Sequence, residues 1–203
     1  MAYLSRSEVM AIGFRRVGQD VRISDRAVFY HPGMMEIGDH VRIDDFCMLS
    51  HRVTLGNHVF LAAYVTLLSD SESEIVMDDF STMAWKGTVF TESDDYKGGF
   101  LTNPTVPMKY RHCTRGSVRI GRHAIIGCGS MIFPGAHLAE GSAVGAMALV
   151  TRPTRPWTIY AGVPARAVSA RKQDLLERER QLLAEEMPTE SFAEMGQNGE
   201  EKR

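Results

Sequence analysis

Three arginines close to the end of the chain could bind a phosphorylated ligand. They are Arg152, Arg155 and Arg166. Each guanidinium group presents a planar fork of N–H donors, and this geometry suits the oxygens of a phosphate group. The alternative is that these arginines only keep an exposed corner of the protein soluble. We favour phosphate binding, which requires the surrounding elements to hold the three arginines close together.

The cysteines and the overall charge narrow the class of protein. The three cysteines, Cys47, Cys113 and Cys128, form no C-x-x-C motif, and a disulfide between any two of them would leave the third unpaired. This pattern is typical of a protein that works in a reducing cytoplasm. The formal net charge of −2 and the pI of about 6.4 argue against nucleic-acid binding. No secretory stretch opens the chain, and no apolar run reaches the roughly 18 residues of a membrane span. We therefore expect a cytoplasmic protein with no nucleic-acid partner and no membrane insertion.

The elements around the arginines belong to an internal repeat of six residues. Blocks of 3, 6, 3 and 6 hexads begin at residues 17, 37, 77 and 120, which gives 18 hexads. Every first position is Ile, Leu, Val, Met or Phe, and every fifth position is Val, Ala, Gly, Cys, Ser or Thr. A hexad suffices for one short strand and one tight corner, so three hexads close a triangular coil of about 18 residues. The repeat predicts an all-β solenoid, a parallel β-helix of about six triangular coils.

Segments outside the repeat complete the predicted organisation. Ser5, followed three residues later by Glu8, predicts a capped N-terminal helix. Residues 95–119 form a long protruding loop, either functional or a tolerated insertion, and its aromatic and basic side chains favour a function. Leucines on a helical stripe predict a helix after the repeat. The predicted parts are an N-terminal helix, a β-helix domain, a C-terminal helix and a disordered tail, over residues 1–16, 17–168, 169–187 and 188–203.

The fourth block of hexads carries a family resemblance. Residues 120–168, IGRHAIIGCGSMIFPGAHLAEGSAVGAMALVTRPTRPWTIYAGVPARAV, resemble the C-terminal half of the hexapeptide-repeat acyltransferases and contain their Y-A-G-x-P-A-R closure. The likeness covers roughly residues 5–170. It is strongest to galactoside- and maltose-type sugar O-acetyltransferases, including those of surface-polysaccharide gene clusters. The resemblance implies a left-handed coil, a homotrimer, and acetyl-CoA bound as co-substrate in the groove between adjacent prisms.

The resemblance also assigns the residues that contact the coenzyme. Carried over by position, they are Cys128, Ala146, Thr151, Arg152 and Arg166. The two arginines are the ones that suit phosphate oxygens on chemical grounds. Cys128 is interpreted as a small core or groove residue, because nothing near it in the sequence would activate a thiol nucleophile.

The catalytic base is the point at which this sequence departs from the family. The family places a histidine at the start of the long loop, and that position falls here on Asp94. Aspartate is a weak base at pH 7 unless burial and neighbouring negative charge, here from Glu92 and Asp95, raise its pKa. The alternative base is His112, the one histidine in the loop, if the loop folds back over the groove; otherwise it is a solvated loop residue. We favour Asp94 slightly over His112.

The acceptor residues also differ from the family pattern. Tyr64 replaces the asparagine that contacts the acceptor, so the acceptor need not be a simple galactoside. Asp95 and Tyr96 are the acceptor residues expected from the loop itself.

These features lead to one function and two alternatives. The favoured function is acetyl-CoA-dependent O-acetyl transfer to a hydroxyl group of a small sugar or polysaccharide precursor, by direct transfer with a general base. The first alternative is N-acyl transfer to an amino-sugar nucleotide, and the second is a non-catalytic solenoid scaffold. Zinc carbonic anhydrases with the same prism need two histidines five residues apart, and the seven histidines here never have that spacing. We therefore expect no metal.

Overall fold

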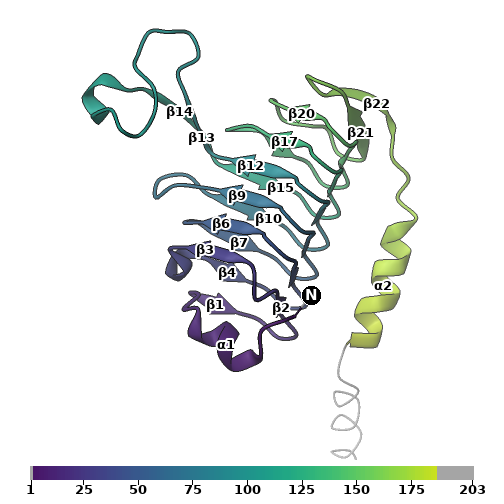
Figure 1. Ribbon diagram of the computed structural model, residues 1–203. Helices are drawn as coiled ribbons and strands as arrows, with labels where there is room; N and C mark the ends of the chain where they lie inside the picture. The colour runs from purple at the N-terminus through teal and green to yellow at the C-terminus, as the bar shows by residue number, and fades with distance from the viewer. Residues whose placement is uncertain (1, 187–203) are drawn as a thin grey trace, which may run out of the picture. The chain divides into compact units, whose positions relative to one another are not determined.

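The structure is a computed structural model that describes residues 2–186, and most of it is a three-sided stack of short parallel strands (Figure 1). The first face contains β1 (Arg16–Val17), β4 (Glu36–Ile37), β7 (Val53–Leu55), β10 (Ile75–Met77), β15 (Val118–Ile120) and β18 (His137–Leu138). The second face contains β2 (Arg22–Ile23), β5 (Arg42–Ile43), β8 (Phe60–Leu61), β11 (Thr82–Met83), β16 (Ile125–Ile126) and β19 (Ala143–Val144). The third face contains β3 (Val28–Tyr30), β6 (Met48–Ser50), β9 (Thr66–Leu68), β12 (Thr88–Phe90), β17 (Met131–Ile132) and β20 (Leu149–Val150).

The first position of each hexad supplies the core of this stack. Along the second face these side chains lie in register and are fully buried: Ile23, Ile43, Leu61, Met83 and Ile126. Burying one such side chain contributes about 1.5–3 kcal/mol. With three strands per coil and six coils, the fold is the predicted left-handed parallel β-helix, and that expectation is confirmed.

The corner between the first and second faces is a ladder of rings. His40 stacks on His58 at 4.6 Å between ring centroids, His58 on Phe80 at 4.6 Å, and Phe80 lies 5.3 Å from His123. All four residues have φ between 56° and 58°, in the left-handed region. Each coil therefore turns this corner with the same backbone conformation, which places one ring above another at the spacing of neighbouring coils.

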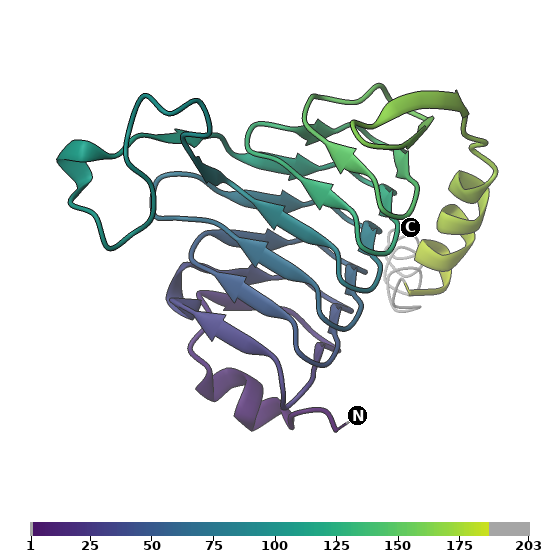
Figure 2. The same ribbon diagram turned by 45° about the horizontal axis from the view of Figure 1, so that its top comes forward.

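One insertion interrupts the stack between β12 and β15. It begins with β13 (Glu92–Asp94) and ends with β14 (Cys113–Arg115), which pair antiparallel with Asp94 opposite Cys113. We call residues 92–115 the inserted ribbon; it projects from one corner of the stack and contains the short helix η2 (Met108–Tyr110) (Figure 2). The predicted loop of 95–119 is therefore shorter and partly ordered, because its last residues pair as β14 and β15.

The two ends of the chain add a few elements to the stack. The predicted capping box is present in α1 (Arg6–Ala11), where the Ser5 hydroxyl accepts from the backbone N–H of Glu8. The short helix η1 (Pro32–Met34) precedes β4. After the last coil, β21 (Thr158–Ala161) pairs parallel with β19 and antiparallel with β22 (Arg166–Ala170).

The described residues divide into two compact units, one that ends at Arg171 and one that begins at Lys172. The second unit contains α2 (Leu175–Glu186), which begins later than the helix predicted from residue 169 because Ser169 and Ala170 pair with β21 as part of β22. The predicted tail, residues 188–203, lies outside the described residues. Within residues 2–186, neither α-helix is long and apolar enough to cross a lipid bilayer.

Candidate active site

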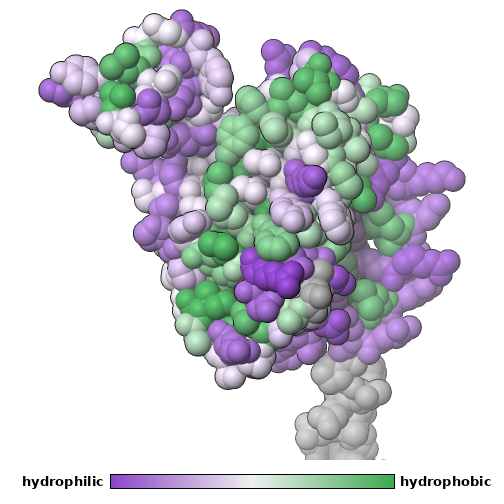
Figure 3. Space-filling view, viewed as in Figure 1, coloured by the Kyte–Doolittle hydropathy of each residue, from purple (hydrophilic) through white to green (hydrophobic). Residues whose placement is uncertain are grey.

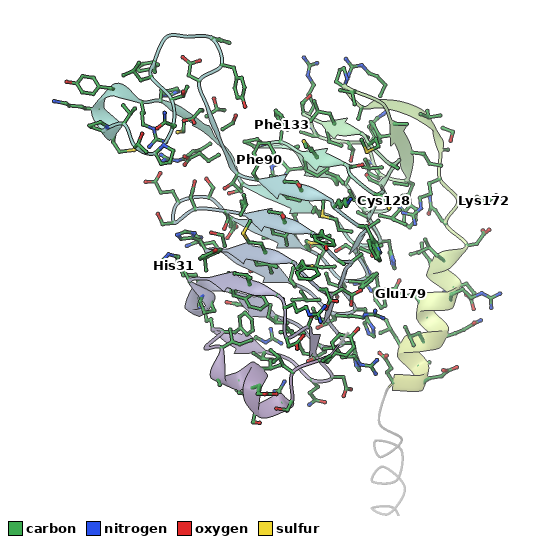
Figure 4. The ribbon with its side chains drawn as sticks, in the orientation of Figure 1. His31, Phe90, Cys128, Phe133, Lys172 and Glu179 are labelled. Atoms are coloured by element: carbon green, nitrogen blue, oxygen red, sulfur yellow. The ribbon has the colours of Figure 1, made fainter. Side chains whose placement is uncertain are left out.

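A pocket of about 370 Å³ lies between the inserted ribbon and the last coils of the stack. Its wall contains five of the predicted site residues: Asp94, Asp95, Tyr96, His112 and Thr151. Phe133, which closes it on the side of the stack, lies near Phe90 at the base of the ribbon (Figure 4). The structure therefore brings both candidate bases and the predicted loop acceptor residues to one cavity, which we call the ribbon pocket.

A second pocket, of about 280 Å³, lies at the end of the stack and is lined by Arg152, Arg155 and Arg166. Thr151 borders both pockets, so they are neighbours. Among the described residues, no carboxylate pairs with any of the three guanidinium groups. We call this the arginine pocket. It unites the three arginines as the sequence predicted; Nη1 of Arg166 donates to the backbone carbonyl of Ala165, and no described carboxylate neutralises the three positive charges.

Asp94 is held by three hydrogen-bond donors. The backbone N–H of Asn103 donates to Oδ2 over 3.2 Å, the Cys113 thiol donates to Oδ1 over 3.4 Å, and Nη2 of Arg111 lies 3.5 Å from Oδ1. The Asn103 N–H is the largest of several causes that lower the pKa of Asp94, with Cys113 and Arg111 acting in the same direction. This shift is opposite to the raised pKa that an aspartate would need to deprotonate a hydroxyl group.

Asp95 organises the ribbon itself. Its carboxylate accepts hydrogen bonds from the backbone N–H groups of Lys97, Gly99 and Phe100 over 2.7–3.1 Å, which lowers its pKa. This carboxylate holds the turn that follows β13, which differs from the acceptor contact expected from the sequence. Tyr96, on the same turn, is 92% exposed.

The two candidate bases belong to opposite faces of the ribbon. Asp94 pairs with Cys113 and Ser93 with Thr114, so alternation along the strands places these pairs on opposite faces. His112 precedes Cys113 and shares the face of Thr114, where its ring lies 5.2 Å from that of Phe100. Both residues border the ribbon pocket, but their side chains therefore leave opposite faces of the ribbon.

The remaining predicted residues lie at another corner. Tyr64, Cys128 and Ala146 follow β8, β16 and β19, at the corner between the second and third faces. The inserted ribbon leaves from the corner between the third and first faces. Cys128 and His31 mark these two edges of the third face (Figure 4). Within one chain the structure does not bring Tyr64, Cys128 or Ala146 to Asp94.

Sequence reasoning missed the partners of Asp94. Arg111 and Cys113 contact its carboxylate, although both are more than 16 residues away along the chain. No local pattern identifies them, because their proximity depends on the antiparallel pairing of β13 with β14. The separate corner of Tyr64 and Cys128 could have been found by counting hexads, since Tyr64 is the fourth residue of the hexad that begins at Leu61 and Cys128 the third residue of the hexad that begins at Ile126.

This fold, with a pocket lined by three arginines beside a carboxylate-bearing insertion, is that of a hexapeptide-repeat transferase. The chain matches the family described as Bacterial transferase hexapeptide (six repeats) over residues 34–69. It is 35% identical over 182 residues to the dTDP-4-amino-4,6-dideoxy-D-glucose acyltransferase of Escherichia coli, covering 88% of this chain and 94% of that protein. The chain therefore belongs to the hexapeptide-repeat acyltransferases, which confirms the predicted family and enzyme class.

Solved structures extend the comparison. AntD, an N-acyltransferase from Bacillus cereus crystallised with dTDP and 3-hydroxybutyryl-CoA, is 42% identical, with a TM-score of 0.88 over 90% of this chain and 97% of AntD. A maltose O-acetyltransferase from Clostridium difficile is 16% identical, with a TM-score of 0.54 over 83% of this chain and 75% of that one. At this low identity the second likeness shows the fold alone.

Proposed function

We propose that this enzyme transfers an acyl group from an acyl-CoA to the amino group of a nucleotide-linked amino sugar. The observation that carries the proposal is Asp94, a carboxylate with a lowered pKa where the family has a histidine. N-acyl transfer was the first alternative drawn from the sequence, and both the carboxylate and the relatives support it over O-acetyl transfer.

The chemistry of the acceptor explains why a low-pKa carboxylate fits an amine. A hydroxyl group attacks a thioester only while a base removes its proton, and the best base has a pKa near the working pH. An amine is nucleophilic without that help once it is neutral. An ionised Asp94 can bind the ammonium form, orient the neutral amine, and accept the proton that the nitrogen must lose once attack on the carbonyl has made it cationic.

The reaction balances without a further reagent. The sugar nitrogen attacks the thioester carbonyl, forming a C–N bond, and the C–S bond then breaks. The proton lost by nitrogen passes through Asp94 and neutralises the departing coenzyme A thiolate, directly or through solvent. A backbone N–H would stabilise the oxyanion formed on the way.

The arginine pocket is proposed to bind the phosphates of the coenzyme. Arg152 and Arg166 present N–H donors with no described carboxylate partner, and Thr151 joins this pocket to the ribbon pocket. A coenzyme with its phosphates on the arginines could therefore extend its thioester toward Asp94. Acetyl is the acyl group expected from the sequence, and the AntD complex adds 3-hydroxybutyryl-CoA as a donor to test.

A homotrimer would complete the site. Tyr64, Cys128 and Ala146 lie at a different corner from Asp94, so they can contribute to the same site only if another copy of the chain supplies them. That corner carries exposed apolar side chains, including Phe46, Trp85 and Met147. Figure 3 shows apolar surface on the side of the molecule that faces the viewer. Light scattering should report about three times 22.6 kDa; an active monomer would contradict a shared site.

The proposed function is tested with matched acceptors. The purified enzyme is incubated with acetyl-CoA or 3-hydroxybutyryl-CoA and either dTDP-4-amino-4,6-dideoxyglucose, the sugar nucleotide in the name of the Escherichia coli relative, or the same nucleotide with a 4-hydroxyl group. Release of coenzyme A thiol and the mass of the product are followed. We expect acylation of the amino sugar only. Transfer to the hydroxyl compound, or to simple galactosides alone, would support O-acyl transfer instead.

A further inference from the structure

The carboxylate of Asp94 belongs to a three-membered cluster within the ribbon. Oδ1 is 3.4 Å from the Cys113 thiol and 3.5 Å from Nη2 of Arg111, and that Nη2 lies 3.7 Å from the Cys113 sulfur. Among residues 2–186, Oδ2 has one partner, the backbone N–H of Asn103. A carboxylate offers about four acceptor sites, two on each oxygen. Both sites of Oδ1 are therefore occupied, whereas one site of Oδ2 remains open.

Arg111 is unusually placed for a loop arginine. Its side chain is only 10% exposed, and its Nε has no hydrogen-bond partner within the described part of the chain. Burying a charged group with an unsatisfied donor costs free energy. Its charge faces the Asp94 carboxylate at the long end of hydrogen-bonding distance, which fits a group that fixes an ionised carboxylate without occupying both of its oxygens.

We propose that Cys113 and Arg111 are positioning residues for the reaction: together they hold Oδ1 of Asp94, which leaves Oδ2 to receive the acceptor amine. This inference rests on the proposed function, because it assigns the open site of Oδ2 to the amine. Neither residue touches the substrate. They act through the orientation and charge of Asp94.

The thiol is suited to donate rather than to react. Burial, followed by hydrogen bonding to Glu92 and Asp94, raises the pKa of Cys113 to about 11, so the thiol keeps its proton at neutral pH. Other charged groups near this face of the ribbon include Glu92 and Arg115, which pair with each other at 2.8 Å, and Arg115 also pairs with Asp70 and Glu72. Cys113 is thus the neutral donor of the cluster and Arg111 its cation.

The first test uses activity and a conservative variant. Cys113→Ala removes the donor and should lower kcat roughly 3- to 10-fold, the size of one hydrogen bond, with KM for acyl-CoA unchanged. Cys113→Ser keeps an O–H donor and should stay within about twofold of the native kcat. Lys109→Ala, an exposed change in the same ribbon, is the control. Equal losses in the Ser and Ala variants, or no loss in either, would overturn the proposal.

The second test needs no acceptor. Cys113 is alkylated with iodoacetamide at pH 8.5, and the modified peptide is quantified over time in the native enzyme and in Asp94→Asn. Loss of the negative charge should make the thiol ionise more readily and speed its alkylation by roughly threefold or more. Exposed Cys128, at another corner, should react at an unchanged rate in both proteins.

The two tests separate this inference from the proposed function. Faster alkylation of Cys113 in Asp94→Asn, in an enzyme that acylates no amino sugar, would uphold the cluster and contradict the acceptor. Acylation of the amino sugar with an unchanged alkylation rate would uphold the function and overturn the role of Cys113.

Discussion

The coils and the inserted ribbon achieve their order by different means. In the coils, large aliphatic side chains such as Leu61 and Ile126 are fully buried and pair in register with their counterparts one coil away. In the ribbon, order comes from strand pairing and polar contacts: β13 pairs with β14, and Arg115 lies within 3.4 Å of the carboxylates of Asp70, Glu72 and Glu92. The repeat provides stability, and the chemistry is found where the repeat is interrupted.

The sharpest test of this division is Asp94→Asn in the ribbon. The amide keeps the shape but cannot take a proton or balance an ammonium, so we expect kcat to fall roughly 10²- to 10⁴-fold. Because Asp94 contributes nothing to the core, the thermal midpoint should stay within a few degrees of the native value. Steady-state kinetics and thermal unfolding measure the two effects.

A second variant, at His112, distinguishes between the two candidate bases. His112→Ala should leave most of the activity intact, since its side chain leaves the opposite face of the ribbon from the Asp94 carboxylate, although both residues border the ribbon pocket. In the native enzyme the lowered pKa of Asp94 keeps it ionised between pH 5 and 8. A rise of kcat/KM with pH in that range should therefore follow deprotonation of the acceptor amine and shift when an acceptor of different pKa is used. A large loss in His112→Ala would transfer the role of base to the histidine.

The opposite experiment is Leu61→Ala in the coils. Its fully buried side chain lies between Ile43 and Met83, so truncation should cost about 2–5 kcal/mol of unfolding free energy. Thr54→Ala, an outward change on β7, should cost less than about 0.5 kcal/mol. Denaturant unfolding measures both. A small loss for Leu61→Ala would mean that the coils are not held together by their aliphatic core.

The contrast between coils and ribbon also explains how far the sequence could predict the structure. The hexad is a local pattern, so its phase assigns each residue to a face or a corner, and the core and the six coils follow directly. Arg152 and Arg166 line one pocket, as predicted, because both lie at the end of the same stack.

The position of the ribbon in the chain could be predicted from the sequence, but its internal pairing and side-chain contacts could not. Its backbone pairing and the contacts of Asp94 join residues 9 to 19 positions apart, and no periodicity links them. The pKa of Asp94 was expected to rise if it were the base, because Glu92 and Asp95 are its neighbours in sequence. In the structure it is lowered, because Asn103, Cys113 and Arg111 donate to its carboxylate.

A fourth prediction concerns the arginine pocket, at the end of the coils. Arg152→Ala or Arg166→Ala should raise KM for acyl-CoA by roughly 10- to 150-fold, equivalent to about 1.5–3 kcal/mol for a charged hydrogen bond. The KM for the acceptor should change little, because the acceptor is assigned to the ribbon pocket. Initial rates at varied acyl-CoA and acceptor concentrations give the two KM values separately. Unchanged KM for acyl-CoA in both variants would leave these arginines a solubilising role only.

The smallest expected effect is at Asp95, and it tests whether the ribbon can lose order while the coils remain folded. Its pKa is lowered, chiefly by the N–H of Lys97, so the native ribbon binds this proton less readily than the unfolded chain. The order that Asp95 provides is therefore complete above the unfolded pKa near 3.9 and is lost as the pH falls through the lower native value. Asp95→Asn should reproduce that loss at pH 7, since its one carbonyl oxygen cannot serve all three donors. Hydrogen exchange should accelerate at the amides of Lys97, Gly99 and Phe100 and stay slow in the coils. Exchange that accelerates in both regions would show that the ribbon and the coils unfold together, and the distinction between them would fail.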